Sequence, residues 1–207
     1  VAKELVRYSP NLILIVVSNP MDTMTYLCNQ VLNIPKQKII GMGGALDSAR
    51  FKYRIAEVLQ CPSSDIQSMV IGGHSDVGML PLTRLATRNS IRITELLSKN
   101  QLDKILESTK IGGATLTSML GTSAWYAPGA AVSALVHSIA CNQKKLFPCS
   151  VLLSGEYGLD DICIGVPVIL GHNGVEKIVD VDLNQEEKDK LRISAQGVIK
   201  TNKLLQN

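Results

Sequence analysis

The sequence lacks the features that mark several common classes of protein. No CxxC pair occurs, and the five cysteines are odd in number and widely separated. Neither a disulfide framework nor a zinc site is therefore indicated, and a reducing, cytoplasmic setting fits best. The longest apolar run, residues 12–17, is far below the roughly twenty residues of a membrane span, so it predicts a buried strand instead.

A strong excess of charge is also missing. The 207 residues contain 21 Lys and Arg against 18 Asp and Glu, and the basic residues are scattered along the chain. Such a balance excludes the basic footprint that nucleic-acid-binding proteins need. Because repeats, linkers and low-complexity stretches are absent too, we expect a compact fold with neither nucleic-acid nor membrane partners.

The hydrophobic pattern divides the chain into two regions. The first, residues 1–44, contains a helix end (1–8), the apolar strand (12–17), a helix (23–32) that Asp22 is placed to cap, and a strand (38–41) that leads into a glycine-rich turn (41–44). This order predicts a strand, helix, strand crossover in a parallel sheet covered on both faces.

The second region, residues 45–207, mixes helices with antiparallel strands. Its expected elements are a helix (46–60), a short strand (68–71), extended chain (80–93), a helix broken at Gly112-Gly113 (94–118), a helix (127–142), a three-stranded meander (147–179) and a helix (184–205). The fold class is therefore α/β, with a βαβ piece followed by an α+β region.

Two motifs carry side chains suited to proton transfer and anion binding. His74 directly follows a strand within Gly72-Gly73-His74-Ser75-Asp76, where the glycines let other groups approach closely. A lone histidine is often structural, and Asp47 and Arg50, three residues apart at a helix start, could form a surface ion pair. In the functional interpretation, Asp47 accepts a hydrogen bond from the imidazole of His74, and Arg50 grips a substrate carboxylate bidentately.

Two further segments are candidate ligand contacts. Ser18-Asn19-Pro20 lies at the carboxyl end of the predicted parallel strand, the edge where open α/β sheets bind ligands, although a simple turn explains it equally well. The segment Gly121-Thr122-Ser123-Ala124-Trp125-Tyr126-Ala127-Pro128-Gly129 combines hydroxyls, aromatics and glycine before a helix. It could wall a small polar pocket, with packing as the alternative.

Three motifs together resemble the lactate/malate dehydrogenase family. They are Val17-Ser18-Asn19-Pro20, Leu46-Asp47-Ser48-Ala49-Arg50-Phe51 and Gly73-His74-Ser75-Asp76, in that order and spacing. The resemblance covers essentially the whole chain, corresponds to the C-terminal two thirds of family members, and is closest to the bacterial, lactate-dehydrogenase-like malate branch. It implies that residues 1–44 are the last strands of a doubly wound (Rossmann) NAD-binding domain and residues 45–207 the catalytic domain.

The resemblance also implies a role for each site residue. His74 would be the acid/base that takes the hydroxyl proton during alcohol oxidation, with Asp47 as its orienting partner. Arg50 would bind the substrate carboxylate, and Asn19 would contact the substrate oxygen beside the nicotinamide. Gly72-Gly73-His74 favours the malate branch, because lactate enzymes usually carry a glutamate immediately before the histidine.

For the cofactor, the resemblance implies NAD. Val17, Ser18 and Asn19 would line its nicotinamide end, and Asn19-Pro20 is a candidate for a cis peptide bond. The chain contains neither G-x-G-x-x-G after an apolar strand nor the acidic residue that would hold the adenosine ribose, and Gly41-Met42-Gly43-Gly44 does not fit that spacing.

The implied activity is NAD-dependent interconversion of malate and oxaloacetate in the tricarboxylic acid cycle, by a homodimer or homotetramer acting on small 2-hydroxy and 2-oxo acids. Lactate dehydrogenase is the alternative within the family, because the mobile loop that sets this choice is not in the sequence. Outside an active dehydrogenase, the chain could be an inactive fragment that keeps only oligomer surfaces. A hydrolase using Ser75 is disfavoured, because Ser75 and His74 are neighbours and project divergently.

The beginning of the sequence indicates a piece of a longer protein. Residues 1–8 have helical periodicity but no starting Met, basic leader or cleavage site. We expect roughly a hundred further residues ahead of them, lost by cleavage or truncation or carried by a second chain. Since their absence would bare the face and edge of the sheet at the apolar residues 12–17, the chain alone is expected to be unstable or partner-dependent, and inactive.

Overall fold

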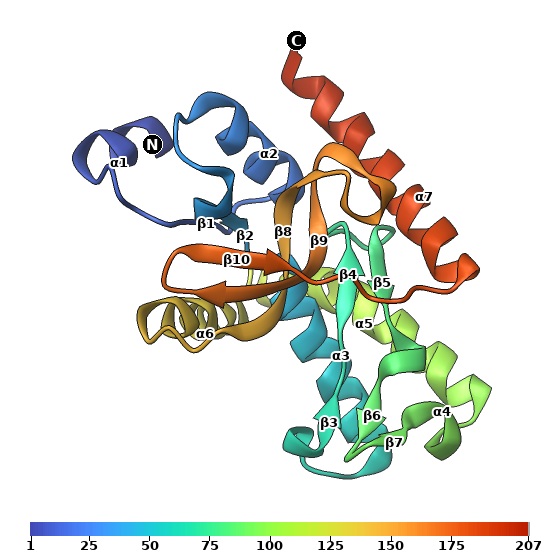
Figure 1. Ribbon diagram of the computed structural model, residues 1–207. Helices are drawn as coiled ribbons and strands as arrows, with labels where there is room; N and C mark the ends of the chain where they lie inside the picture. Colours follow the sequence, from blue (N-terminus) through green and yellow to red (C-terminus); the bar gives the residue numbers. More distant parts are fainter. Residues whose placement is uncertain (207) are drawn as a thin grey trace.

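The chain folds around a mixed sheet whose strands come from both ends of the sequence (Figure 1). The computed structural model describes residues 1–206. Neighbouring strands in the sheet are, in order, β1 (Leu14–Val16), β2 (Ile39–Gly41), β8 (Lys145–Ser154), β9 (Asp160–Gly171), β4 (Val70–Gly72) and β5 (Met79–Pro81), with β10 (Gly174–Ile178) paired to β9. The first region of the sequence and the second therefore share one sheet.

The predicted crossover is present at one edge of this sheet. After the short helix α1 (Ala2–Tyr8), β1 and β2 pair in parallel and are joined by α2 (Met21–Val31). Among the described strands β1 is an edge strand with β2 as its one neighbour, so its apolar residues are less covered than those of a strand inside a parallel sheet. Only Val16 in β1 is buried, and Val17 just after it is 41% exposed.

The predicted meander is confirmed and forms the middle of the molecule. Strands β8 and β9 pair antiparallel along nearly their whole length, and β10 turns back on β9. The inward side chains of β8 and β9 are buried in the larger of two apolar clusters, together with residues from β2, α3 (Gly43–Leu59), β4 and α7 (Gln185–Asn202), and those of β10 are partly buried against it. This cluster makes a firm support for the strand ends that carry the candidate site.

Two predictions based on glycine pairs were wrong. Helix α3 begins at Gly43, not at residue 46, so Gly43 and Gly44 belong to its first turn and not to a turn before it. Helix α5 (Lys99–Leu120) runs straight through Gly112-Gly113, and the actual break lies before it, where Ser98 and Gln101 form a capping box. Gly43, Gly44 and Gly113 each face a close neighbour, which explains why the helices keep them despite their low propensity, whereas Gly112 makes only an ordinary contact with Arg50.

The second apolar cluster fills the end of the molecule below the main sheet in Figure 1. Here α3 packs beside α5 and a small sheet of β3 (Ile66–Gln67), β6 (Thr87–Arg88) and β7 (Ile91–Arg92), with α4 (Ile93–Leu96) alongside. Phe51, Ile55 and Ile105 are among its buried side chains. The remaining helix, α6 (Tyr126–Ala140), packs against β9. Among residues 1–206, no helix is both long and apolar enough to cross a membrane.

Candidate active site

His74 lies in a tight loop that β4 and β5 hold between them. The loop turns sharply at Gly72, whose φ of 86° is a conformation that side-chain-bearing residues rarely adopt. Ser194 of α7 closes the loop: its Oγ accepts a hydrogen bond from the Gly73 amide at 2.8 Å and donates one to the Gly78 carbonyl at 2.8 Å. The backbone around His74 is therefore fixed from both sides.

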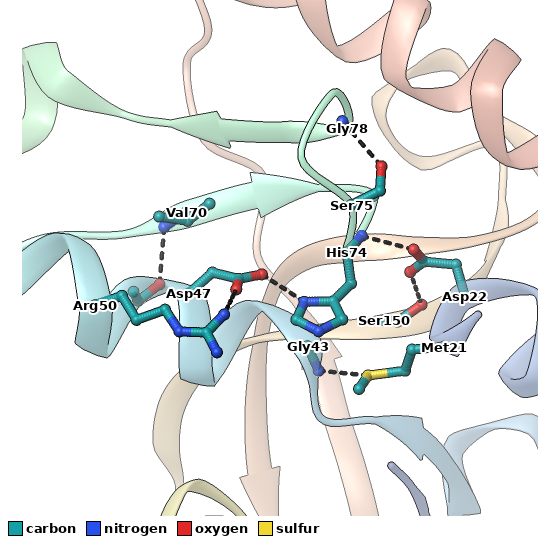
Figure 2. A network of polar contacts seen from close by, with 12 residues as sticks. Met21, Asp22, Gly43, Asp47, Arg50, Val70, His74, Ser75, Gly78 and Ser150 are labelled. Atoms are coloured by element: carbon teal, nitrogen blue, oxygen red, sulfur yellow. Dashed lines mark hydrogen bonds and ion pairs between the residues drawn. The ribbon is translucent and has the colours of Figure 1, made fainter. Parts of the chain in front are cut away.

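The imidazole of His74 faces the buried carboxylate of Asp47 (Figure 2). Nδ1 of His74 lies 2.7 Å from Oδ2 of Asp47, and Oδ1 of the same carboxylate lies 3.3 Å from Nη1 of Arg50. Asp47 is only 1% exposed. Because Asp47 and Arg50 are one helical turn apart on α3, the i to i+3 spacing seen in the sequence sets this geometry.

The surroundings of His74 favour its protonated form. Burial by itself lowers the pKa of the imidazole, but the hydrogen bond to Asp47 and the negative charges of Asp47 and Asp22 outweigh burial and the nearby Arg50 cation. The pKa of His74 is thus raised above its ordinary value of 6.5. A histidine tuned in this way can hold a proton near neutral pH and still release it.

Gly43 leaves the space in which the imidazole sits. A Cβ placed on Gly43 would lie 2.8 Å from Cβ and 2.9 Å from Cγ of His74, closer than real side chains approach. The Gly43 amide meanwhile faces Sδ of Met21 at 2.8 Å, which holds the first turn of α3 under the ring. The glycine that the sequence assigned to a turn is therefore a spacer for His74.

We expect Gly43→Ala to displace the His74 ring by several tenths of an ångström and lower turnover by roughly tenfold to a hundredfold, since misplacement of a reacting group by about 1 Å can cost about a hundredfold. Steady-state kinetics of the active enzyme measures this. The matched control is Gly197→Ala on α7, where an added Cβ meets nothing within 4 Å. Equal turnover in the two variants would show that the Gly43 contact does not position the ring.

His74 and Arg50 open into one cavity of about 640 Å³. Val17, Ser18 and Asn19, at the carboxyl end of β1, also line it, and the Asn19-Pro20 peptide is cis, as expected. These three residues share the cavity with His74 but take no part in the polar network of Figure 2. A separate cavity of about 510 Å³ beside α7 contains none of the candidate residues.

Further residues of this cavity were missed in the sequence. Lys110, Gly113, Ala114 and Thr117 of α5 line it, and an added Cβ on Gly113 would lie 3.3 Å from Nη1 of Arg50. Their i, i+3, i+4 and i+7 spacing was the available signal, but the break expected at Gly112-Gly113 obscured it.

The segment before α6 supplies part of the cavity wall. Ser123, Ala124 and Pro128 line it, whereas the aromatic side chains of Trp125 and Tyr126 are 60% and 86% exposed and lie outside the lining. The pocket wall expected here is therefore provided by the small residues of the segment and not by its aromatics.

Ser75 has a structural partner of its own. Its Oγ accepts a hydrogen bond from the Gly78 amide at 3.0 Å, and the Nδ1 that could have activated it is engaged by Asp47. Ser75 therefore stabilises the turn, and the arrangement does not support a Ser75 nucleophile.

A histidine and carboxylate pair beside an arginine thus lines a cavity at the carboxyl end of a parallel strand, the edge where α/β folds bind ligands, and comparison with known proteins identifies the family. A family model described as the lactate/malate dehydrogenase, alpha/beta C-terminal domain, matches residues 44–204. The chain belongs to the lactate/malate dehydrogenase family, and the resemblance seen in the sequence is confirmed. Relatives named malate dehydrogenase include one from Bacteroides fragilis, 58% identical over 205 residues, and one from Flavobacterium johnsoniae, 57% identical over 198.

Solved structures confirm the α/β fold. Malate dehydrogenase from Salinibacter ruber is 41% identical with a TM-score of 0.96, covering 99% of this chain and 67% of that one. Lactate dehydrogenase from Cryptosporidium parvum, solved with lactic acid and nicotinamide adenine dinucleotide, is 34% identical with a TM-score of 0.96, covering 100% of this chain and 67% of that one. The chain spans 66% of the length of the Bacteroides fragilis relative, including its C-terminal part.

Proposed function

We propose that the chain is the catalytic part of an NAD-dependent malate dehydrogenase, which interconverts malate and oxaloacetate. The observation that carries this proposal is the 2.7 Å contact between His74 and Asp47 at a cavity that Arg50 also lines. Such a site offers one group to move a proton and another to hold a carboxylate. The names of the relatives from Bacteroides fragilis and Flavobacterium johnsoniae support malate over lactate.

The cavity suits a nicotinamide at one end. Val17, Ser18 and Asn19 form an open, partly apolar wall where a parallel strand ends, which is where α/β folds bind such rings. When bound there, the nicotinamide would accept the hydride from the hydroxyl-bearing carbon or return it to the ketone. We infer that these three residues would hold that end of NAD, and that residues 1–44 are the last part of the dinucleotide-binding domain.

His74 would move the proton at Nε2. Its Nδ1 donates to Asp47, so Nε2 of the neutral ring is an acceptor. Nε2 is therefore the ring nitrogen that is available to a ligand in the cavity. During oxidation Nε2 takes the proton of the substrate hydroxyl, and during reduction it returns a proton to the ketone oxygen as hydride arrives at the carbon. Asp47 stabilises the charged ring in between, because its own carboxylate is buried beside it.

Arg50 would orient the substrate. One terminal nitrogen of its guanidinium is held by Asp47, and the side chain lines the same cavity as His74. The fork can then offer its other N–H groups to the carboxylate next to the reacting carbon. We propose that Asn19, which lines the same cavity, contacts the substrate oxygen. We also propose that the enzyme is a homodimer or homotetramer in a reducing, cytoplasmic setting. All five cysteines are free thiols, which supports that setting.

The test is oxaloacetate-dependent NADH oxidation, with pyruvate assayed in parallel. We would compare the 207-residue chain with the same chain fused behind the N-terminal third of the Bacteroides fragilis relative, the part of that relative which the chain does not span. We expect the fusion to oxidise NADH with oxaloacetate far faster than with pyruvate. Preference for pyruvate would make the chain a lactate dehydrogenase, and a folded fusion that binds NADH but reduces neither acid would refute the catalytic assignment.

The pH dependence of the two directions should be opposite. Reduction needs protonated His74, so its rate is full below the pKa of His74 and falls as pH rises through it; oxidation needs the neutral ring and rises over the same range. Since Asp47 holds the pKa of His74 above its ordinary value of 6.5, we expect reduction to persist to neutral pH or above. Initial rates across pH in both directions measure this, and a reduction rate that rises through neutral pH would contradict it.

A further inference from the structure

A second carboxylate lies beside His74 and has no part in the proton transfer proposed for Nε2. Asp22, in the first turn of α2, is 6% exposed. The sequence predicted it as a helix cap, but Pro20 occupies the N-cap position and the side chain of Asp22 points away from the helix end, towards the loop of His74 (Figure 2). That expectation was wrong, and the two contacts of Asp22 explain where the side chain goes instead.

Each carboxylate oxygen of Asp22 accepts a hydrogen bond from a different part of the fold. Oδ2 accepts from the backbone amide of His74 at 2.7 Å, and Oδ1 accepts from the hydroxyl of Ser150 on β8 at 2.6 Å. Ser150 is 1% exposed. The carboxylate thus connects the crossover helix α2, the central strand β8 and the loop that carries the imidazole.

Buried carboxylates are costly unless they are well satisfied. Burial raises the pKa of Asp22, against the hydrogen bonds from Ser150 and the His74 amide and the charge of His74, which lower it. An asparagine at this position has a single acceptor oxygen, so it could not accept from both the His74 amide and the Ser150 hydroxyl in this arrangement. The carboxylate satisfies both donors at once and also brings a negative charge close to His74.

We propose that Asp22 is a positioning residue for His74: its carboxylate holds the backbone of His74 in place and gives the imidazole a second negative neighbour, opposite Asp47. His74 then lies between a carboxylate on its ring and a carboxylate on its amide. Both negative charges favour the imidazolium form that donates the proton. This inference rests on the proposed acid/base role of His74 and deepens it.

Several other charged and titratable groups lie near Asp22 and His74. Asp47 and Arg50 approach the imidazole from α3, Lys110 of α5 lines the same cavity, and Asp76 lies on the loop of His74 itself. The thiol of Cys163 on β9 is also a neighbour of Asp22. Burial raises the pKa of this thiol well above its ordinary value, and the charge of Asp22 raises it further. All of these side chains are still present when Asp22 or Ser150 is replaced.

The experiment follows His74 directly, by NMR titration of its ring protons in the fusion with the N-terminal third of the Bacteroides fragilis relative. His74 is assigned by the loss of its signals in His74→Asn, and the exposed His137 and His172 serve as internal references. We expect Asp22→Asn to move the titration midpoint of His74 to lower pH, and Ser150→Ala to move it in the same direction by less. Asp160→Asn, which removes an exposed carboxylate on β9, should leave it unchanged.

Hydrogen exchange at the His74 amide tests the positioning role separately. We expect Asp22→Ala to speed this exchange by about tenfold or more, since an internal hydrogen bond to a charged group stabilises by roughly 1.5–3 kcal/mol. An unchanged His74 midpoint in both Asp22→Asn and Ser150→Ala would overturn the electrostatic part, and unchanged exchange in Asp22→Ala would overturn the positioning part. Both readouts are independent of turnover, so failure of the proposed dehydrogenase activity would not mimic either result.

Discussion

Replacing His74 by asparagine should lower the turnover of the complete enzyme by on the order of 10² to 10⁴, because the variant loses a positioned acid/base. The Nε2 atom that faces the substrate cavity would be gone, whereas the asparagine amide can still donate to Asp47. The smaller side chain also fits above Gly43, so the fold should be retained. Steady-state kinetics of oxaloacetate reduction measures the effect, with circular dichroism and thermal unfolding to check the fold.

The matched control for that variant is His137→Asn. His137 lies exposed on α6 and lines no part of the cavity that holds His74. Its replacement should leave turnover unchanged within about twofold, as is usual for surface substitutions. If His74→Asn kept near-normal turnover while NADH still bound, another group would have to move the proton, and the mechanism proposed for Nε2 would be wrong.

Local spacing predicted the parts of the site that depend on neighbours in sequence. Asp47 and Arg50 lie on one face of α3 because they are three residues apart, and His74 follows directly on a strand between glycines. The meander of β8, β9 and β10 could be predicted for the same reason, since apolar runs alternated with glycine-containing turns. In each case the residues that predict the feature lie within about ten positions of one another in the sequence.

What could not be predicted depends on partners far apart in the chain. The contacts of Asp22 join it to His74, 52 residues away, and to Ser150, 128 residues away, whereas its local context was that of a helix cap. Gly112 and Gly113 were taken as a helix break from their low helical propensity, but α5 continues through them where it packs against Arg50 of α3. Tertiary packing overrode propensity at both places.

The second large effect is expected for Arg50→Lys. The guanidinium of Arg50 has one nitrogen at 3.3 Å from Asp47 and lies against Gly113, so the fork is held in one orientation at the cavity wall. A lysine ammonium is a point charge that cannot bind Asp47 and a carboxylate in the same planar geometry. We expect KM for oxaloacetate to rise roughly tenfold to a hundredfold, since one hydrogen bond between charged groups is worth about 1.5–3 kcal/mol.

The split between KM and kcat distinguishes binding from a general loss of structure in Arg50→Lys. Removal of an interaction present both before and during the reaction raises KM with little change in kcat. Arg54→Lys is the matched control, because Arg54 lies one turn further along α3 and pairs with Glu57 at the surface, 2.9 Å away. An unchanged KM in Arg50→Lys would place the substrate carboxylate elsewhere in the cavity, and Lys110, the other cation among its lining residues, would be the next to replace.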